Sequence, residues 1–548
     1  MRKHILVAVS VLLCILLVAG CNEKTKTGVK NTSSSDNTSN VSSDISSDIS
    51  SDDTSSASDE SSSVAADEST ASTVVNSNAS SGKTIRSLME NEIVPSGNTS
   101  ILLRNVSGGA DSEAAAMRNK ILNTKDSLKV TGTKYYISSK NGNDDNDGLS
   151  PQTAWQTADA ITLNSFLMKA GDAVLFERGC VFRPTSQIFC KSGVSYGAYG
   201  TGEKPIIYGS VRNYSYPGLW TPSQKKNVWK MTFTLEDAGI IVFDHGKEVG
   251  DKKNGLLAVT ENFDYYHNVT DNMIYLYLDK GRPNQVFKDI EIGTRRAVFT
   301  LVRGVENVTI DNICMKYTGN FAVQCIGEQK NVKITNCEMG WIGGSYMIDG
   351  KQSRYGNGVQ FWDDASNCLV DNCWVYQVYD TGLTFQGPSD AIYENVDFTN
   401  NLVEYTCMAV EFWLQKTEGR PDSGYVKDCD ITGNILRLSG YEWSTAMRPN
   451  PVQTSFIQGG NEGSYEIKSM NISNNIFDKS TYYFFKWSKT DLKNVTLRNN
   501  SYYGQKSLVE APILYNNADT AVKVSDLDTL RKAVSAIEPN AKKVSWCN

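Results

Sequence analysis

The chain has 548 residues, with 61 acidic and 54 basic side chains and a formal net charge of −7. A negative balance of this kind argues against a nucleic acid as partner. Beyond the first twenty residues the only histidines are His245 and His267, both in the first half of the chain. A serine nucleophile in the second half would therefore lack a histidine base, which disfavours a serine triad there.

The N-terminus predicts secretion. Arg2 and Lys3 precede a short apolar run that ends at Ala19, too short to span a bilayer and typical of a signal peptide. The run leads into Val18-Ala-Gly-Cys21, which resembles a bacterial lipobox. The resemblance implies that residues 1–20 are a lipoprotein signal peptide and that Cys21 carries the lipid, palmitate included. It also implies a cell membrane lipoprotein exposed on the extracellular side. An ordinary secretory signal is the alternative.

A tether and a helical lead-in are expected next. Residues 21–100 are rich in Ser, Thr, Asn and Asp and poor in aromatic residues, so they predict a disordered linker. Residues 101–133 form the lead-in, in which the Ala-rich stretch predicts a helix over 112–123. About 440 residues then remain for the folded body, enough for a large core.

The folded body is expected to begin at Lys134. The segment 134–151, together with 171–179 and 197–205, resembles the opening of secreted bacterial β-helix proteins. That resemblance implies an amphipathic capping helix over 155–170. The loop holding Asp144, Asp145 and Asp147 is a candidate Ca²⁺ site, because carboxylates are ligands that Ca²⁺ prefers. An Asx-rich turn is the alternative interpretation. Residues 214–293 predict a small antiparallel β insertion.

A seven-residue pattern recurs through the second half of the chain. Each copy alternates apolar and polar residues, as a strand with one buried face does. Self-similarity at periods of roughly 20–50 residues indicates a stacked repeat, here built from strands. The copies begin at Asn307, Asn331, Asn367, Asn395, Asp428, Ser469 and Asn494.

Asparagine occupies the sixth position of six copies, and Gly433 occupies it in the other. Both residue types tolerate the left-handed backbone of a sharp corner. Such a column resembles the asparagine ladder of right-handed parallel β-helices, the pectate-lyase-like fold of many pectate lyases and polygalacturonases. The resemblance implies an all-β, right-handed parallel β-helix solenoid over 134–503, of a carbohydrate-active type. Residues 504–548 are expected to cap its end, with a helix over 524–541 whose N-cap is Ser525.

A second strand is expected after each copy, and its alternation predicts inward and outward residues. Two outward columns follow. One holds Trp362, Gln386 and Trp413. The other holds Gln324, Gln360, Thr384, Glu411, Gln458 and Lys486.

The cysteines between Cys180 and Cys547 have two interpretations. Cys337 and Cys373 occupy the same repeat position on consecutive rungs, where a disulfide is geometrically feasible. Core packing is the preferred interpretation, because buried cysteine is a common small core residue. No Cys or His spacing suggests zinc.

Two long connections, 338–356 and 436–452, are expected to wall a cleft whose floor is the outward column. Carboxylates on that floor suit glycoside hydrolysis, which needs one carboxylic acid and a second carboxylate. Exposed Trp rings and Arg groups suit sugar rings and hydroxyls. The predicted catalytic residues are Glu411, with Asp380 or Asp363 as partner. The predicted polysaccharide-binding residues are Trp362, Trp413, Gln360, Gln386, Arg354, Trp443, Arg448 and Lys486.

The function hypothesis is accordingly a membrane-tethered, monomeric glycoside hydrolase that requires no cofactor. One alternative is a polysaccharide lyase for a uronate polymer, with Lys486, Arg354 or Arg448 as base and Ca²⁺ against the substrate carboxylate. The acid-rich floor disfavours the lyase, since it should repel a polyuronate unless a metal ion intervenes. The paired-Asp, Gly-His-Gly and Arg-x-Lys motifs of polygalacturonases have no match here. The other alternative is a non-catalytic glycan-binding or adhesive protein, which needs the Trp column and none of the carboxylates.

Overall fold

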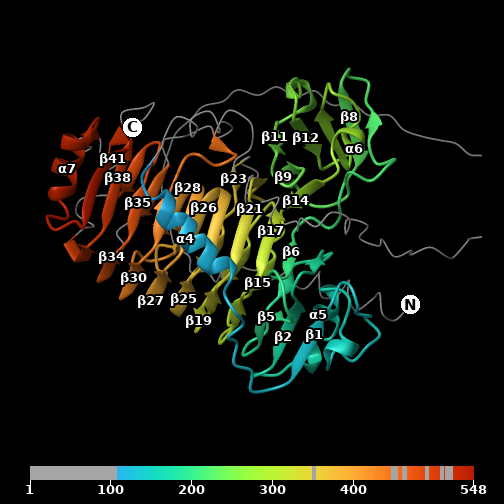
Figure 1. Cartoon of the computed structure of the whole chain (residues 1–548), viewed down its shortest axis with the longest axis horizontal. Coiled ribbons are helices and arrows are strands. Elements are labelled where there is room, and N and C mark those ends of the chain that lie inside the picture. The colour runs from blue at the N-terminus through green and yellow to red at the C-terminus, as the bar shows by residue number, and fades with distance from the viewer. Residues whose placement is uncertain are drawn as a thin grey trace, which may run out of the picture. The chain divides into compact units, whose positions relative to one another are not determined.

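The computed structural model describes residues 108–348, 353–445, 454–459, 466–487, 493–505, 511–512 and 522–547. The predicted signal peptide, the tether and Cys21 lie outside them. Within them, parallel strands coil into a right-handed β-helix (Figure 1), so the expected fold class is confirmed. No helix of the described part has the length and apolar character that crossing a bilayer requires.

Each complete turn of the solenoid, or rung, carries three strands. Equivalent strands of successive rungs pair in parallel roughly 4.8 Å apart, which gives three runs along the solenoid. Run 1 contains β1 (Lys134–Ile137), β2 (Ala173–Glu177), β5 (Ser195–Tyr199), β16 (Thr309–Asp311), β20 (Lys333–Thr335), β25 (Ala365–Asp371), β27 (Ile392–Thr399), β30 (Cys429–Thr432), β34 (Met470–Ser473) and β37 (Val495–Arg498). Short strands β19 (Gln329–Lys330), β29 (Tyr425–Lys427) and β33 (Glu466–Ile467) pair beside it.

Run 2 contains β3 (Val181–Phe182), β6 (Ile206–Tyr208), β17 (Cys314–Thr318), β21 (Glu338–Ile342), β26 (Trp374–Pro388), β28 (Leu402–Gln415), β31 (Ile435–Arg437), β35 (Ile476–Asp478), β38 (Ser501–Gln505) and β41 (Lys543–Cys547). Run 3 contains β4 (Ile188–Phe189), β15 (Phe299–Leu301), β18 (Val323–Ile326), β24 (Val359–Trp362), the second halves of β26 and β28, β32 (Ser455–Gly459) and β36 (Tyr483–Lys486). Runs 1 and 3 are the two strands predicted for each repeat.

The corner between runs 1 and 2 is made by the sixth position of the repeat, as predicted. Its six asparagines have φ between 52° and 63°, and Gly433 has 72°. The seventh position adds a buried ladder that the sequence analysis missed. Each amide Nδ2 there donates to a run 1 carbonyl, while Oδ1 accepts the backbone N–H of the preceding rung. The ladder residues are Asn401, Asn434, Asn475 and Asn500.

Cysteine takes the ladder position on the two rungs before Asn401. The Cys373 Sγ accepts from the backbone N–H of Cys337, and the Asn401 Oδ1 accepts from that of Cys373. The ten cysteines of the described part are buried and form no disulfide with one another, which confirms core packing over a disulfide.

Run 2 was not anticipated as a strand. Its residues were assigned to loops because the corner after it is made by large residues rather than by Gly or Asn. Tyr317, Trp341, Gln377 and Tyr405 all have positive φ, between 50° and 60°. Bulky residues rarely adopt this conformation, so the pattern of residue types carries no signal for the corner.

The ends of the solenoid are capped by shorter helices than expected. In place of one helix over 155–170 there are 3₁₀ turns at Pro151–Thr153 and Ser165–Leu167 and helix α5 (Asp159–Leu163). Asn164 ends α5 because its side chain donates to the Ala160 carbonyl. Helix α7 (Leu527–Ser535) begins at Asp526 rather than Ser525, since Asp526 accepts from the Thr529 N–H in a capping box.

The predicted antiparallel insertion is present between β6 and β15. One sheet holds β7 (Thr221–Pro222), β8 (Val228–Thr232), β11 (Asp251–Lys252), β12 (Asp264–Asn268) and β13 (Met273–Tyr277), and another holds β9 (Ala238–Phe243), β10 (Glu248–Val249) and β14 (Ile290–Thr294). The 3₁₀ helix η4 (Leu256–Ala258) lies between β11 and β12, and the short helix α6 (Pro283–Val286) lies between β13 and β14. Two further antiparallel pairs are β22 (Ser345–Tyr346) with β23 (Arg354–Tyr355), and β39 (Ala511–Pro512) with β40 (Lys523–Val524).

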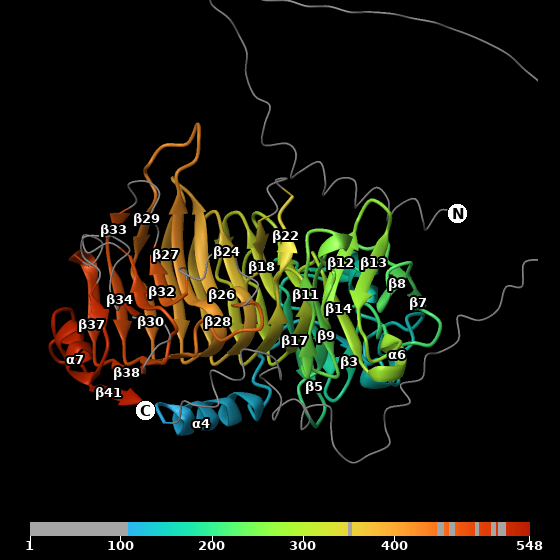
Figure 2. The ribbon, with the colours of Figure 1, turned by 90° about the horizontal axis from the view of Figure 1, so that it is seen from above.

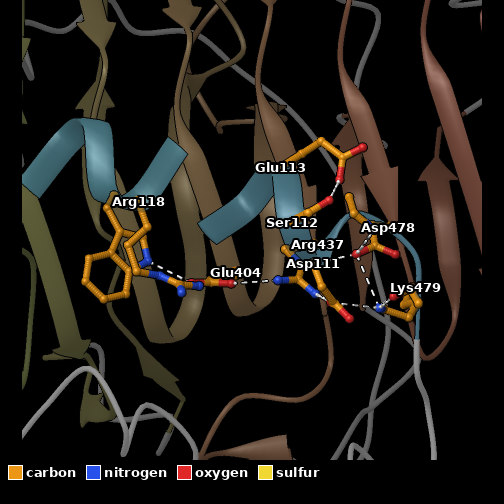
Figure 3. Close-up of polar contacts among 11 residues, drawn as sticks. Asp111, Ser112, Glu113, Arg118, Glu404, Arg437, Asp478 and Lys479 are labelled. Carbon is orange, nitrogen blue, oxygen red and sulfur yellow. Dashed lines mark hydrogen bonds and ion pairs between the residues drawn. The ribbon is translucent and has the colours of Figure 1, made fainter. Parts of the chain in front are cut away.

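Helix α4 (Asp111–Leu122) lies across the outer face of run 2 (Figure 2). Only Ala114, Ile121 and Leu122 of this helix are buried, so charges supply much of the contact. The Arg118 Nη2 lies 2.5 Å from the Glu404 Oε1. Figure 3 shows the row that continues beneath the helix, where ion pairs link Glu404, Arg437, Asp478, Lys479 and Asp111.

Candidate active site

The outward column of run 3 forms in the predicted register. Gln324, Gln360, Thr384, Glu411, Gln458 and Lys486 pair in sequence across β18, β24, β26, β28, β32 and β36. The column is not the exposed wall that was expected. Glu411 is 3% exposed and Gln458 is 1% exposed, and only Gln324 is half-buried. A buried polar row of this kind must satisfy its groups internally or with a ligand.

Glu411 is the centre of the row. Its Oε2 accepts from the hydroxyls of Thr381 and Thr384 at 3.3 Å each, and its Oε1 accepts from the Gln458 Nε2 at 3.0 Å. Burial, and then the neighbouring charge of Asp380, raise the pKa of the Glu411 carboxyl to about 8. A shift in this direction favours the protonated carboxyl, which is the state that a general acid needs.

Asp380 reaches Glu411 through a β-bulge. The pairing of β26 with β28 shifts register between Val378 and Thr381, so the residues between them lie outside the regular ladder. A bulge re-aims the side chains at its centre. A bend at Gly382 was the expected device. Gly382 instead lies within the continuous β26, where an added Cβ would meet the Val403 Cγ1 at 2.5 Å.

The bulge is held in place by the preceding rung. The Asp380 backbone N–H donates to the Gly356 carbonyl at 3.2 Å, and the Thr381 N–H donates to the Asn357 Oδ1 at 3.0 Å. Thr381 was not predicted as a site residue. It belongs to the bulge, where the two-residue alternation that identified the column no longer applies.

The two long connections approach the site at Tyr379, next to Asp380. The Arg354 guanidinium lies 4.6 Å from the centroid of the Tyr379 ring and 5.9 Å from that of Trp443. The two rings are 5.6 Å apart. The two connections were expected to form separate walls of a cleft, and here they contact each other. Trp443 is 3% exposed, so its ring packs inside the wall, whereas a sugar-stacking surface was expected. Arg448, the remaining predicted wall residue, lies outside the described residues.

The antiparallel insertion anchors one wall. The Asp237 Oδ2 accepts from the Tyr346 N–H at 2.7 Å, and both Asp237 oxygens lie 2.6 Å from the Lys252 Nζ. Lys252 also lies 4.1 Å from the centroid of the Tyr346 ring. Burial lowers the pKa of Lys252 to about 7. The β22–β23 hairpin that carries Arg354 is therefore tied to the insertion.

The Trp column forms at the far end of the same strands. Trp362, Gln386 and Trp413 pair in register across β24, β26 and β28, and each is half-buried. Asp363, the other candidate catalytic acid, follows Trp362 and is buried in an ion pair with Arg303 and one with Arg420. These two ion pairs hold the Asp363 carboxylate in the turn, which gives it a structural role.

The Asp144 loop is built as an Asx turn. The Asp144 Oδ1 accepts from the backbone N–H groups of Gln156 and Thr157 at 2.8 Å, and the Asp147 Oδ1 accepts from that of Leu149. Among the described residues, no group of three or more His, Cys, Asp and Glu side chains is arranged to hold a metal ion.

Comparison with known proteins identifies no family. No family model and no curated protein matches the chain. Among solved structures, XylC with xylose is 11% identical with a TM-score of 0.37, over 70% of this chain and 71% of that one. A glycoside hydrolase is 9% identical with a TM-score of 0.43, over 76% and 96%. The GH136 lacto-N-biosidase from Eubacterium ramulus is 14% identical with a TM-score of 0.35, over 74% and 59%. Likeness at this identity concerns the fold alone.

Proposed function

We propose that the protein is a glycoside hydrolase in which Glu411 is the general acid and Asp380 is the second carboxylate. The observation that carries the proposal is the buried Glu411 carboxyl, which accepts hydrogen bonds from Thr381, Thr384 and Gln458 beside the bulge that holds Asp380. Glycoside hydrolysis requires two carboxyl groups whose environments separate their pKa values. Asp380 and Glu411 lie on the paired strands β26 and β28, and adjacent strands are roughly 4.8 Å apart.

The proton balance follows from this pair. Glu411 gives its proton to the glycosidic oxygen as the bond from that oxygen to the anomeric carbon breaks. Asp380 either takes a proton from the water that attacks the anomeric carbon, or attacks that carbon itself and forms a glycosyl ester. In the second case a water molecule then attacks the anomeric carbon, Glu411 takes the proton of that water, and the bond from the sugar to Asp380 breaks. Thr381, Thr384 and Gln458 hold the Glu411 carboxyl in one orientation, so its proton is delivered along a fixed direction.

Anchoring to the membrane belongs to the same proposal. Cys21 at the lipobox-like junction supports lipidation, and the Ser-rich segment 21–100 supports a tether that lets the body reach an extracellular polysaccharide. Labelling cells with a palmitate analogue tests this part. Label on the parent chain that is lost with Cys21→Ser supports it, and equal label on both contradicts it.

The activity test uses the full chain and a panel of polysaccharides, with and without EDTA. Release of reducing ends without the ultraviolet absorbance of an unsaturated uronate supports hydrolysis. EDTA-sensitive absorbance would instead favour the lyase and Lys486. Retention on an affinity gel with neither signal would favour a binding protein.

A matched pair of variants assigns the activity to the site. Glu411→Gln is expected to lower the rate by at least about a hundredfold, the usual contribution of a general acid. Glu404→Gln changes a buried glutamate of the same strand that lies beneath α4. It is expected to lower stability and to keep activity, which separates lost chemistry from lost folding.

A further inference from the structure

Unpartnered polar atoms surround Glu411. Gln360 and Gln458 flank Thr384 and Glu411 in the run 3 column and are 6% and 1% exposed. Within the described part of the chain, neither amide Oε1 has a hydrogen-bond partner, and neither does the Oγ of the fully buried Ser455. Leaving a buried polar atom unpaired costs about 1–3 kcal/mol, so such atoms beside a site indicate groups that a ligand or water satisfies.

The chemistry of these atoms identifies what they bind. An amide oxygen is an acceptor only, so its partner must be a donor. A sugar hydroxyl donates and accepts, whereas an ionised carboxylate only accepts. The Gln458 Nε2 donates to Glu411, so the Oε1 of the same amide is available to accept a hydrogen bond from a ligand. A uronate carboxylate beside Gln458 would leave that oxygen unpaired.

The charges around Glu411 also favour a neutral ligand. The side chains that donate hydrogen bonds to the Glu411 carboxyl, Thr381, Thr384 and Gln458, are all neutral, and the acidic Asp380 lies in the bulge of the adjacent strand. A second anion brought to this acidic, poorly hydrated position is repelled. Within the six-residue column, the one basic side chain is Lys486, a rung beyond Gln458.

We infer that the sugar units bound beside Glu411 are neutral, and that Gln360 and Gln458 accept hydrogen bonds from their hydroxyl groups. The inference rests on the proposed function and narrows its substrate class to glycans without a carboxylate at the cleavage point. Gln360 and Gln458 become specificity residues, on either side of the two carboxyl groups.

The test compares matched polymers. A glucan, a mannan and a galactan are each offered beside the same polymer with its primary hydroxyls oxidised to carboxylates. Affinity is measured with the full chain carrying Glu411→Gln, which leaves the polymer intact. The neutral member of at least one pair is expected to bind at least about tenfold more tightly, since like-charge contact costs kilocalories.

Two variants test whether Gln360 and Gln458 cause the preference for neutral polymers. Gln360→Leu and Gln458→Leu are each expected to weaken binding of the neutral polymer by about fivefold to tenfold. Gln324→Leu is the control, three rungs from Glu411 in the same column, and is expected to change affinity by less than about twofold.

Equal or tighter binding of the oxidised polymers would overturn the inference. Binding that is indifferent to both Gln variants, or no binding of any neutral polymer, would overturn it as well. The results that would contradict the proposed function differ from those that would contradict the inference. Cleavage of an oxidised polymer by hydrolysis keeps the hydrolase and ends the neutral-substrate inference. Gln-dependent binding of a neutral polymer that the parent chain never cleaves keeps the inference and ends the hydrolase.

Discussion

Replacing Glu411 by glutamine should alter how the stability of the protein depends on pH. The pKa of this carboxyl rises from an ordinary 4.5 to about 8 in the folded chain, through burial and Asp380. Between these values the native state holds a proton that the unfolded state has released. The free energy of unfolding therefore falls as pH rises, and the stabilising protonation is lost through the folded pKa. Glutamine has no proton to lose, so the variant lacks this contribution.

The magnitude follows from linkage. Each pH unit across the window costs about 1.4 kcal/mol, so from pH 4.5 to 7 the parent should lose about 3 kcal/mol relative to Glu411→Gln. Denaturant unfolding of both chains at a series of pH values measures the difference. Parallel stability curves for the two chains would refute the argument that a proton is held at this site.

The remaining predictions concern Asp380, the buried ladder and α4. Asp380→Asn should lower the pKa of Glu411 and shrink the pH-dependent loss of stability described above, and an unchanged loss would show that Asp380 does not act on Glu411. Asn475→Ala should cost about 3 kcal/mol in denaturant unfolding, since it leaves buried backbone groups unpaired. The control is Asn395→Gly, because this exposed residue has a φ of 57° that glycine tolerates; it should cost less than about 1 kcal/mol, and equal costs would contradict the ladder. Arg437→Met should speed proteolysis at α4 by leaving acidic partners unpaired, and unchanged cleavage would mean that apolar contacts hold the helix.

Residue types at the corners explain which parts of the fold were predictable. Asn312 and its equivalents occupy a backbone region that favours asparagine, so the first corner is visible as a column of one residue type. The corner at Tyr317 and Trp341 uses the same region with bulky residues, which the surrounding coil imposes. Run 2 ends at that corner and was mistaken for loops. The chain therefore has three strands per turn where two were expected.

The candidate site was likewise predictable only in part. Period-two alternation identified Glu411 as outward, because it lies in a regular strand. The burial of Glu411 depends on residues that are distant in the sequence, so the local pattern around Glu411 does not predict it. Asp380 lies in a bulge, so its approach to Glu411 follows from the register shift between two strands. Trp443 was expected to face a ligand and instead packs on Tyr379, since the two walls converge.

The most direct test of the central claim is leaving-group rescue. Once the panel has identified the sugar, two glycosides of it are compared, one with an alkyl leaving group and one with a dinitrophenyl group that departs without a proton. Glu411→Gln is expected to lose cleavage of the alkyl glycoside and to keep most cleavage of the aryl one, while Asp380→Asn loses both. Equal loss on both glycosides by Glu411→Gln would contradict its role as the general acid.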